Sequence, residues 1–326
     1  MNDHVLLDVK ELRKYYKVKS SGWVRRKTAL VKAVDRVSLT VKRSETFGLV
    51  GESGCGKTTF GRCVLRLEAP TSGQVRFNDV NVMTSQSHRL RQLRQKMQII
   101  FQDPYSSLDP RHTIGRIIGE PLRVHRSLPS NQITARIGEL LEVVGLHAES
   151  AHRYPHEFSG GQRQRVCIAR ALALNPELII ADEPVSALDV SIQAQILNLL
   201  VDLQERYGLT YIFISHDLSV VRHIADRVAV MYLGRIVESA PSGELYAHPR
   251  HPYTHALLSA VPVANPQKKS DEVVLEGDLP SPLDTPSGCS FHPRCPRKGE
   301  KCDRITPELQ TIAGEQVVAC HYPLVN

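Results

Sequence analysis

A glycine-rich segment ending in a lysine and two hydroxyl residues predicts a site for a phosphorylated ligand. The segment fits the pattern G-x-x-x-x-G-K-S/T, and the apolar run at 46–50 before it is typical of a strand. In such a loop the glycines let backbone N–H groups surround phosphate oxygens, the lysine reaches the terminal phosphates and the first hydroxyl binds Mg²⁺. We therefore expect a nucleotide site. Its expected residues are Gly51, Glu52, Ser53, Gly54, Cys55, Gly56, Lys57, Thr58 and Thr59.

Two carboxylates follow another apolar run, at 178–181. Asp182 is expected to hold Mg²⁺ through water, and Glu183 to orient or deprotonate an attacking water. An Asp-Glu pair after a strand is, taken alone, more often an ordinary helix start. In the same chain as a phosphate loop, it indicates hydrolysis of the bound nucleotide.

Two further polar residues each come directly after an apolar run. Gln102 follows 99–101 and His216 follows 212–215. Ligands bind beyond the carboxyl ends of strands in wound α/β sheets, so both residues are candidates for the same site. We expect Gln102 to reach the metal and His216 to contact the γ-phosphate.

A second glycine-rich segment, Ser159, Gly160, Gly161 and Gln162, opens a helical pattern. It offers backbone N–H groups and a helix dipole to an anion, but no lysine. On the tetrapeptide alone, a glycine-containing helix cap is the simpler interpretation. Because the chain has a single phosphate loop, the other interpretation is an ATP site that the second segment of another polypeptide completes; both interpretations stay open on these residues.

Four of the seven cysteines lie in one stretch near the end of the chain: Cys289, Cys295, Cys302 and Cys320. They could be buried thiols without a ligand, a structural zinc site, or an iron–sulfur cluster. A tail with little apolar core favours a metal over free thiols. Zinc sites usually contain a closely spaced cysteine pair, which is absent here. His292 and His321 could substitute as ligands.

The elements that must position these residues indicate an α/β fold. Strand-like runs at 37–41, 46–50, 97–101, 178–181, 211–214 and 228–232 alternate with helical patterns, and a helix is expected at 58–67. Helical spacing without strands at 114–124, 133–144 and 162–174 predicts an inserted helical subdomain at about 104–173. Prolines after residue 248 place a boundary near 250, giving domains at 1–250 and 251–326.

Length and composition bound the class of protein. With 326 residues and 41% hydrophobic content, the chain can form one large core and a smaller appended unit. The net charge of +7 is concentrated near the start, but no aromatic residues alternate with the basic ones as a stacking platform requires, so we expect no nucleic-acid partner. The sequence lacks a membrane-spanning run and a signal-peptide pattern, which predicts a cytosolic chain.

The ordered set of motifs resembles the ATPase subunits of ABC transporters over about residues 5–245. In that family's terms, Gln102 is the Q-loop, 158–162 the signature, 182–183 the Walker B motif, 186–189 the D-loop and His216 the H-loop. The resemblance implies a P-loop NTPase fold with a RecA-like core, an inserted helical subdomain and a small cysteine-containing C-terminal extension. It also implies that Tyr16 stacks on adenine, with Tyr15 as the alternative register. Phe158 replaces the more usual leucine of the signature.

Further segments resemble the dipeptide/oligopeptide importer branch, and its second ATPase subunit over nearly the whole chain. These are 101–111, His251-Pro252-Tyr253-Thr254 and the terminal cysteines. The resemblance implies an ATPase that energises bacterial uptake of dipeptides or oligopeptides. The alternatives are uptake of nickel, glutathione or another peptide-like solute, and a soluble ABC ATPase of cluster assembly.

The same resemblance implies the cofactors and partners. ATP and Mg²⁺ are expected, with a [4Fe–4S] cluster on the four cysteines, or zinc as the alternative. The expected partners are a paralogous ATPase subunit in a heterodimer, two transmembrane permeases and, through them, an extracytoplasmic substrate-binding protein. The subunit is then peripheral, at the cytoplasmic face of the inner membrane. ATP would lie between Lys57 of one subunit and 159–162 of the other.

Overall fold

The computed structural model describes residues 4–19, 28–125, 128–260 and 280–325. Its residues divide into two compact units that alternate along the chain. Unit 1 comprises 1–4, 42–45 and 84–214, and unit 2 comprises 5–41, 46–83 and 215–326. No helix among the described ranges is long and apolar enough to cross a bilayer.

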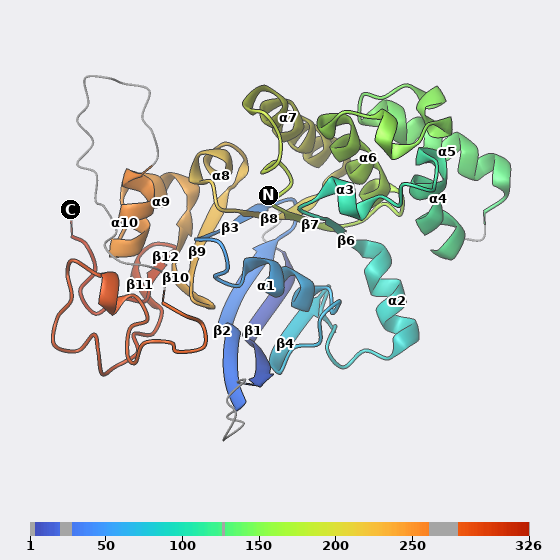
Figure 1. The fold of residues 1–326 in the computed structure, drawn as a ribbon. Coiled ribbons are helices and arrows are strands. Elements are labelled where there is room, and N and C mark those ends of the chain that lie inside the picture. The colour runs from blue at the N-terminus through green and yellow to red at the C-terminus, as the bar shows by residue number, and fades with distance from the viewer. Residues whose placement is uncertain (1–3, 20–27, 126–127, 261–279, 326) are drawn as a thin grey trace, which may run out of the picture. The chain divides into compact units, whose positions relative to one another are not determined.

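Unit 2 contains an antiparallel sheet in the order β2-β1-β4-β5 (Figure 1). Leu7 and Val9 of β1 lie opposite Phe77 and Val75 of β4, and all four side chains are buried. Alternate residues of a strand point to the same face, so this pairing buries one face of the sheet. The strands are β1 (Val5–Lys19), β2 (Thr28–Lys42), β4 (Ser72–Phe77) and β5 (Val80–Asn81).

The other strands of unit 2 include the one that leads into the phosphate loop. This strand, β3 (Thr46–Val50), runs parallel to β9 (Arg227–Tyr232), which pairs antiparallel with β10 (Arg235–Pro241). A hairpin from the end of the chain, β11 (Gln310–Ala313) and β12 (Gln316–Val318), continues from β10 through β12. The C-terminal hairpin is therefore part of unit 2, whereas the predicted domain boundary near residue 250 stays a prediction.

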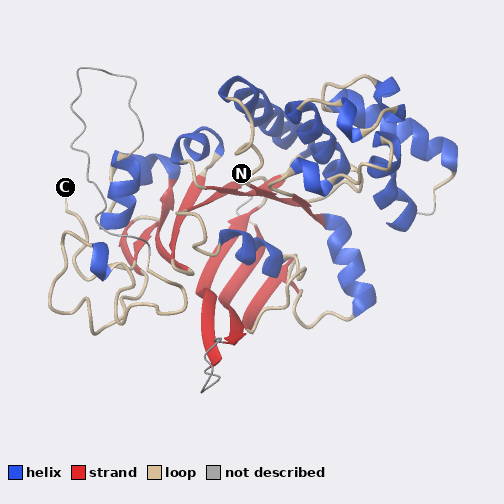
Figure 2. Cartoon of the chain, in the orientation of Figure 1, coloured by secondary structure: helices blue, strands red, loops and turns tan. Residues whose placement is uncertain are grey.

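Short helices complete unit 2 (Figure 2). The first, α1 (Lys57–Val64), ends earlier than the predicted 58–67 because Arg66 has a left-handed backbone with φ 51°, which stops the helix. The others are α8 (Leu218–Ile224), α9 (Ser242–Ala247), α10 (Pro252–Ser259) and the 3₁₀ turn η3 (His292–Arg294).

Unit 1 is built on three parallel strands in the order β8-β7-β6. They are β6 (Met97–Ile100), β7 (Leu178–Asp182) and β8 (Thr210–Ser215), and every residue of β7 and β8 is buried, as expected for strands covered on both faces. The helix α2 (Ser87–Lys96) precedes β6, and the helix α7 (Val190–Tyr207) lies between β7 and β8 in the chain.

Helices occupy the stretch predicted as an insertion, and the described residues between 104 and 172 contain no strand (Figure 1). The helix α4 contacts both α5 and α6. The elements are α3 (Pro104–Ser107), α4 (Ile114–His125), α5 (Ser130–Val143), η1 (Ala148–His152), η2 (Pro155–Glu157) and α6 (Gly160–Leu172).

Candidate functional site

The phosphate loop connects β3 to α1 in unit 2, and two of its glycines have different surroundings. Gly56 has φ 110°, and a Cβ there would lie 1.9 Å from the carbonyl oxygen of Ala33, so no other residue fits without moving the backbone. Gly54 has φ 78°, and a Cβ there would meet nothing within 4 Å. The loop is thus closed against the protein at Gly56 and open at Gly54, which is the arrangement that lets a phosphate approach backbone N–H groups.

The lysine of the loop lies over the loop itself. Lys57 is 4% exposed, and its ammonium donates hydrogen bonds to the carbonyl oxygens of Gly51 at 2.7 Å and Glu52 at 3.0 Å. The neighbouring Cys55 is also buried, and burial raises the pKa of its thiol, which keeps it protonated and unreactive. The loop therefore holds the ammonium of Lys57 through its own carbonyl oxygens, and Cys55 is part of the packed core.

The two tyrosines predicted as alternatives for adenine have different surroundings. Tyr15 donates from its hydroxyl to Asp35 Oδ1 at 2.5 Å, and Arg235 donates to the other oxygen of Asp35 at 2.8 and 2.6 Å. Tyr16 is the next residue of β1, and its ring lies 4.7 Å from Lys14 Nζ. The hydroxyl of Tyr15 is thus held in a hydrogen-bonded group, and both tyrosines stay predictions for adenine.

Unit 1 brings Gln102 and Glu183 into contact. They follow the neighbouring parallel strands β6 and β7, in which Ile100 lies opposite Ala181. Gln102 Nε2 donates to Glu183 Oε2 at 2.9 Å. The preceding residue, Asp182, is 2% exposed at the end of β7.

The backbone at Glu183 is strained. Its φ is 47°, a left-handed conformation that costs a residue with a β-carbon about 1–2 kcal/mol. Its N–H donates to the carbonyl oxygen of Ile214 in β8 at 2.9 Å, which holds this geometry. Strained backbone persists where the surroundings fix it, and such positions are concentrated at functional sites.

The second glycine-rich segment begins α6 with a reciprocal capping box. The Ser159 hydroxyl accepts from the Gln162 N–H at 3.3 Å, and Gln162 Oε1 accepts from the Ser159 N–H at 3.0 Å. A Cβ on Gly161 would lie 2.6 Å from Ile192 Cγ2 of α7, so helix packing requires this glycine. Ser159 and Gly160 are exposed, which leaves the start of α6 accessible.

The remaining predicted residues of unit 2 lie at the start of helices or after a strand. Thr58 and Thr59 are in the first turn of α1. His216 follows β8 and is exposed, and the next residue, Asp217, caps α8 by accepting from the N–H groups of Ser219 and Val220.

Two residues without a predicted role contact the phosphate loop. The Glu52 N–H donates to the Tyr253 hydroxyl at 3.0 Å, and the Glu52 carboxylate accepts two hydrogen bonds from Arg294, at 2.9 and 3.1 Å. Tyr253 belongs to the segment 251–254 that marked the importer branch, but nothing in the sequence around Arg294 singles it out.

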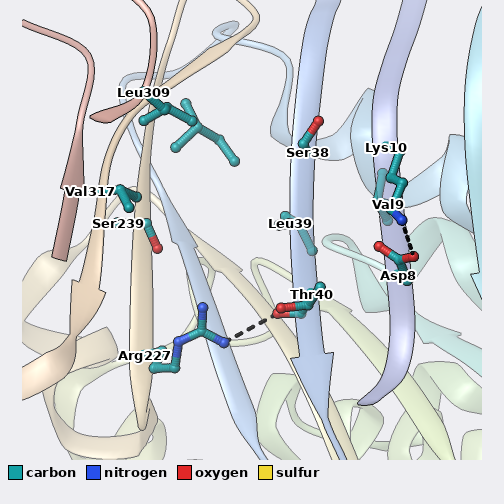
Figure 3. A pocket seen from close by; sticks show the side chains of 11 residues that line it. Asp8, Val9, Lys10, Ser38, Leu39, Thr40, Arg227, Ser239, Leu309 and Val317 are labelled. Carbon is teal, nitrogen blue, oxygen red and sulfur yellow. Dashed lines mark hydrogen bonds and ion pairs between the residues drawn. The ribbon is translucent and has the colours of Figure 1, made fainter. Parts of the chain in front are cut away.

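Unit 2 also has a groove of about 300 Å³ that contains none of the phosphate-loop residues (Figure 3). Its lining comes from the strands β1, β2, β9, β10 and β12 and from Leu309, which precedes β11. Arg227 donates across it to the Thr40 carbonyl oxygen at 3.2 Å, and Lys10 pairs with Asp8 at 3.2 Å. The groove and the predicted phosphate-loop site therefore share no residues.

Comparison with family models gives two matches. The model described as "ABC transporter" matches residues 34–186, which include the phosphate loop, the second glycine-rich segment and the acidic pair. The model described as "Oligopeptide/dipeptide transporter, C-terminal region" matches residues 237–302.

Curated relatives match the chain over almost its whole length. It is 53% identical to an oligopeptide transport ATP-binding protein, AppF, of Bacillus subtilis, covering 98% of each chain. It is 49% identical to the dipeptide transport ATP-binding protein DppF of Escherichia coli, covering 97% of this chain and 93% of the relative.

Solved ATP-binding cassettes have a similar fold. A dimeric cassette in a post-hydrolysis state, bound to ADP and Pi, is 30% identical with a TM-score of 0.64, covering 72% of this chain and 98% of that one. The protein cbiO1 of Clostridium perfringens, part of an ABC transporter complex, is 28% identical with a TM-score of 0.64, covering 75% and 91%. The expected P-loop α/β fold is confirmed.

The expected [4Fe–4S] cluster is wrong. The relatives are peptide transport ATP-binding proteins, and the described part of the chain contains no group of three or more His, Cys, Asp or Glu side chains arranged to hold a metal ion. Zinc, the alternative, lacks support for the same structural reason.

The terminal cysteines are free thiols in the C-terminal turns. Burial raises the pKa of the Cys289, Cys295 and Cys320 thiols, that of Cys320 to about 11. Cys302 is 6% exposed, and its carbonyl oxygen accepts from the Cys289 N–H at 2.8 Å. Cys302 is thus buried, whereas Cys289, Cys295 and Cys320 are partly exposed, and all four are free thiols that give no support to a role in cluster assembly.

Proposed function

Because this chain belongs to the family of oligopeptide and dipeptide ABC transporter ATP-binding proteins, we propose how its residues hydrolyse the ATP that energises peptide uptake. The activity is that of an ATPase coupled to transport, which uses ATP and Mg²⁺ and works with membrane permeases. The identity of the bound nucleotide thus follows from the family, and the assignment of individual residues is our proposal.

We assign nucleotide binding to the phosphate loop. Its N–H groups and Lys57 take the phosphates, a fit supported by the opening at Gly54 and the buried ammonium. Tyr16 is assigned to adenine. Thr58, Asp182 and Gln102 are assigned to Mg²⁺, which suits their oxygen atoms.

The hydrolytic step is assigned to Glu183, which orients or deprotonates the attacking water, with His216 contacting the γ-phosphate. The observation that carries this assignment is the 2.9 Å hydrogen bond from Gln102 to Glu183. It links a proposed metal ligand to the proposed base, and the backbone at Glu183 is held after β7 by the hydrogen bond of its N–H to the Ile214 carbonyl oxygen.

We propose that the site is completed by a second ATPase subunit, a paralogue in a heterodimer. The accessible start of α6 supports this, because Ser159 and Gly160 present a helix N-terminus to the outside of the molecule. Binding of ATP between the two subunits would close the dimer, and hydrolysis would let it open. The helical stretch at 104–173 would transmit this motion to the permeases at the cytoplasmic face of the inner membrane, which receive peptide from an extracytoplasmic binding protein.

The experiment replaces the proposed base. In Glu183→Gln we expect ATP affinity close to that of the wild type and a turnover about 10²–10⁴ lower, because an amide cannot accept the proton. The matched control is Glu205→Gln, an exposed position on α7. Turnover of Glu183→Gln near the wild-type rate would remove Glu183 from its role.

A second variant tests completion by another subunit. Ser159→Arg should lower turnover of the assembled dimer while the isolated chain still binds ATP, because the phosphate loop is intact. Equal loss of binding and turnover in the isolated chain would contradict a site shared between subunits.

A further inference from the structure

The C-terminal extension makes three hydrogen bonds to one residue of the phosphate loop. Arg294 Nη1 and Nη2 donate to the two carboxylate oxygens of Glu52 at 2.9 and 3.1 Å, a fork that only an arginine can form. The Tyr253 hydroxyl accepts from the Glu52 N–H at 3.0 Å. Both the side chain and the backbone of Glu52 are therefore held by residues about 200 or more positions away in the sequence.

The ion pair is shielded from solvent. The Arg294 side chain is 9% exposed and that of Glu52 is 24% exposed. Exposed ion pairs contribute little, but removing one partner of a shielded pair leaves an uncompensated charge. The interaction is thus of the kind whose loss has a measurable effect.

Buried aromatic rings fix the position of Arg294. Phe291, three residues before it, is 1% exposed and packs edge-on against Tyr232, with ring centroids 5.3 Å apart. The same ring contacts Tyr253 at 5.3 Å. The arginine and the tyrosine that hold Glu52 consequently belong to one packed cluster, which limits their independent motion.

Glu52 also contacts the lysine of the loop. Its carbonyl oxygen accepts from Lys57 Nζ at 3.0 Å, so a single residue connects the extension to the cation assigned to phosphate. The carboxylate of Glu52 would repel the phosphates of ATP, because like charges at close range disfavour each other. Arg294 compensates this charge.

We propose that Arg294 is a positioning residue for ATP binding, which neutralises Glu52 and fixes the phosphate loop, so that the C-terminal extension sets the nucleotide affinity of its own subunit. This inference rests on the proposed nucleotide site at residues 51–58. It gives the extension a role in nucleotide binding, through Glu52, in addition to any contact with other subunits.

The test measures equilibrium ATP binding by the full-length chain, with thermal unfolding as a check of the fold. Arg294→Ala should weaken ATP binding at least about tenfold, as expected for loss of a charge-assisted pair. Arg294→Lys keeps the positive charge but not the two parallel hydrogen bonds, so its ATP affinity should lie between those of the wild type and Arg294→Ala. Arg304→Ala is the control, because that arginine is 83% exposed. It should bind ATP like the wild type.

A double variant separates the charge effect from damage to the extension. Adding Glu52→Gln to Arg294→Ala removes the uncompensated carboxylate, so ATP affinity should recover to within about threefold of the wild type. If Arg294→Ala instead distorted the extension, adding Glu52→Gln would not restore the ATP affinity. If Arg294→Ala does not fold, Arg294→Gln replaces it, alone and with Glu52→Gln.

Two results would overturn the inference. One is wild-type ATP affinity in Arg294→Ala, and the other is a double variant, Arg294→Ala with Glu52→Gln, that binds ATP as weakly as Arg294→Ala alone. Failure of the proposed site itself would look different, since the wild type and Arg304→Ala would then both bind no ATP.

Discussion

A substitution at Gly54 tests whether the open side of the phosphate loop is where the nucleotide binds. Gly54 has φ 78°, and a Cβ there would meet nothing within 4 Å. The protein itself therefore has room for a methyl group in Gly54→Ala, but that methyl would occupy the space through which phosphates reach the backbone N–H groups.

The expected effect on stability is small and comes from the backbone alone. Alanine in a left-handed conformation costs about 1–2 kcal/mol, and no clash adds to it. For a domain of this size, a loss of 1 kcal/mol lowers Tm by about 2–4 °C. ATP affinity should fall much further, by tenfold or more, because a lost charge-assisted hydrogen bond to phosphate is worth about 1.5–3 kcal/mol.

Gly314 provides a matched control. It lies in the turn between β11 and β12 with φ 52°, and a Cβ there would also meet nothing within 4 Å. Gly314→Ala should thus lose a similar amount of stability but bind ATP like the wild type. The assay combines chemical denaturation with equilibrium dialysis of labelled ATP for both variants.

If Gly54→Ala binds ATP as tightly as Gly314→Ala, the nucleotide does not bind at the open side of the loop. A much larger loss of stability in Gly54→Ala than in Gly314→Ala would contradict the open surroundings that the structure gives to both positions.

The remaining predictions concern stability. Glu238 is fully buried and accepts hydrogen bonds from Arg250 N, His251 N and Gln316 Nε2. Glu238→Leu should therefore lower the free energy of unfolding by at least about 3 kcal/mol, and Glu238→Gln should lower it by less. Equal losses for the two variants in chemical denaturation would contradict this account. Burial and the hydrogen bond to Asp35 raise the pKa of Tyr15 to about 12 from an ordinary value of 10.0. A raised pKa contributes stability that is complete below pH 10 and is lost as pH rises through 12. Between these pH values the free energy of unfolding of the wild type should therefore fall relative to that of Tyr15→Phe. Parallel plots of the free energy of unfolding against pH for the two proteins would count against the group of Tyr15, Asp35 and Arg235.

Local patterns predicted most elements and the positions of the motifs. The buried strands β3, β7 and β8 were expected because continuous apolar runs indicate strands covered on both faces. Helix ends were less accurate, as at α1, because a left-handed residue such as Arg66 gives no clear sequence signal.

Contacts between distant residues required the tertiary structure. The sequence placed Gln102 and Glu183 after separate strands, and the pairing of β6 with β7 brought their side chains together. The cysteine spacing allowed a metal cluster, but the fold of the C-terminal turns brings no three metal-binding side chains of the described residues into an arrangement that could hold a metal ion.

Three short motifs could be recognised from the sequence, because the geometry of each depends on neighbouring residues. They are the phosphate loop, the acidic pair Asp182-Glu183 and the second glycine-rich helix start. The pairing of Arg294 with Glu52, 242 positions away, and of Tyr15 with Asp35 became visible in the folded protein. Ion pairs and hydrogen bonds of this kind depend on where the fold places two side chains, and spacing along the sequence does not specify that distance.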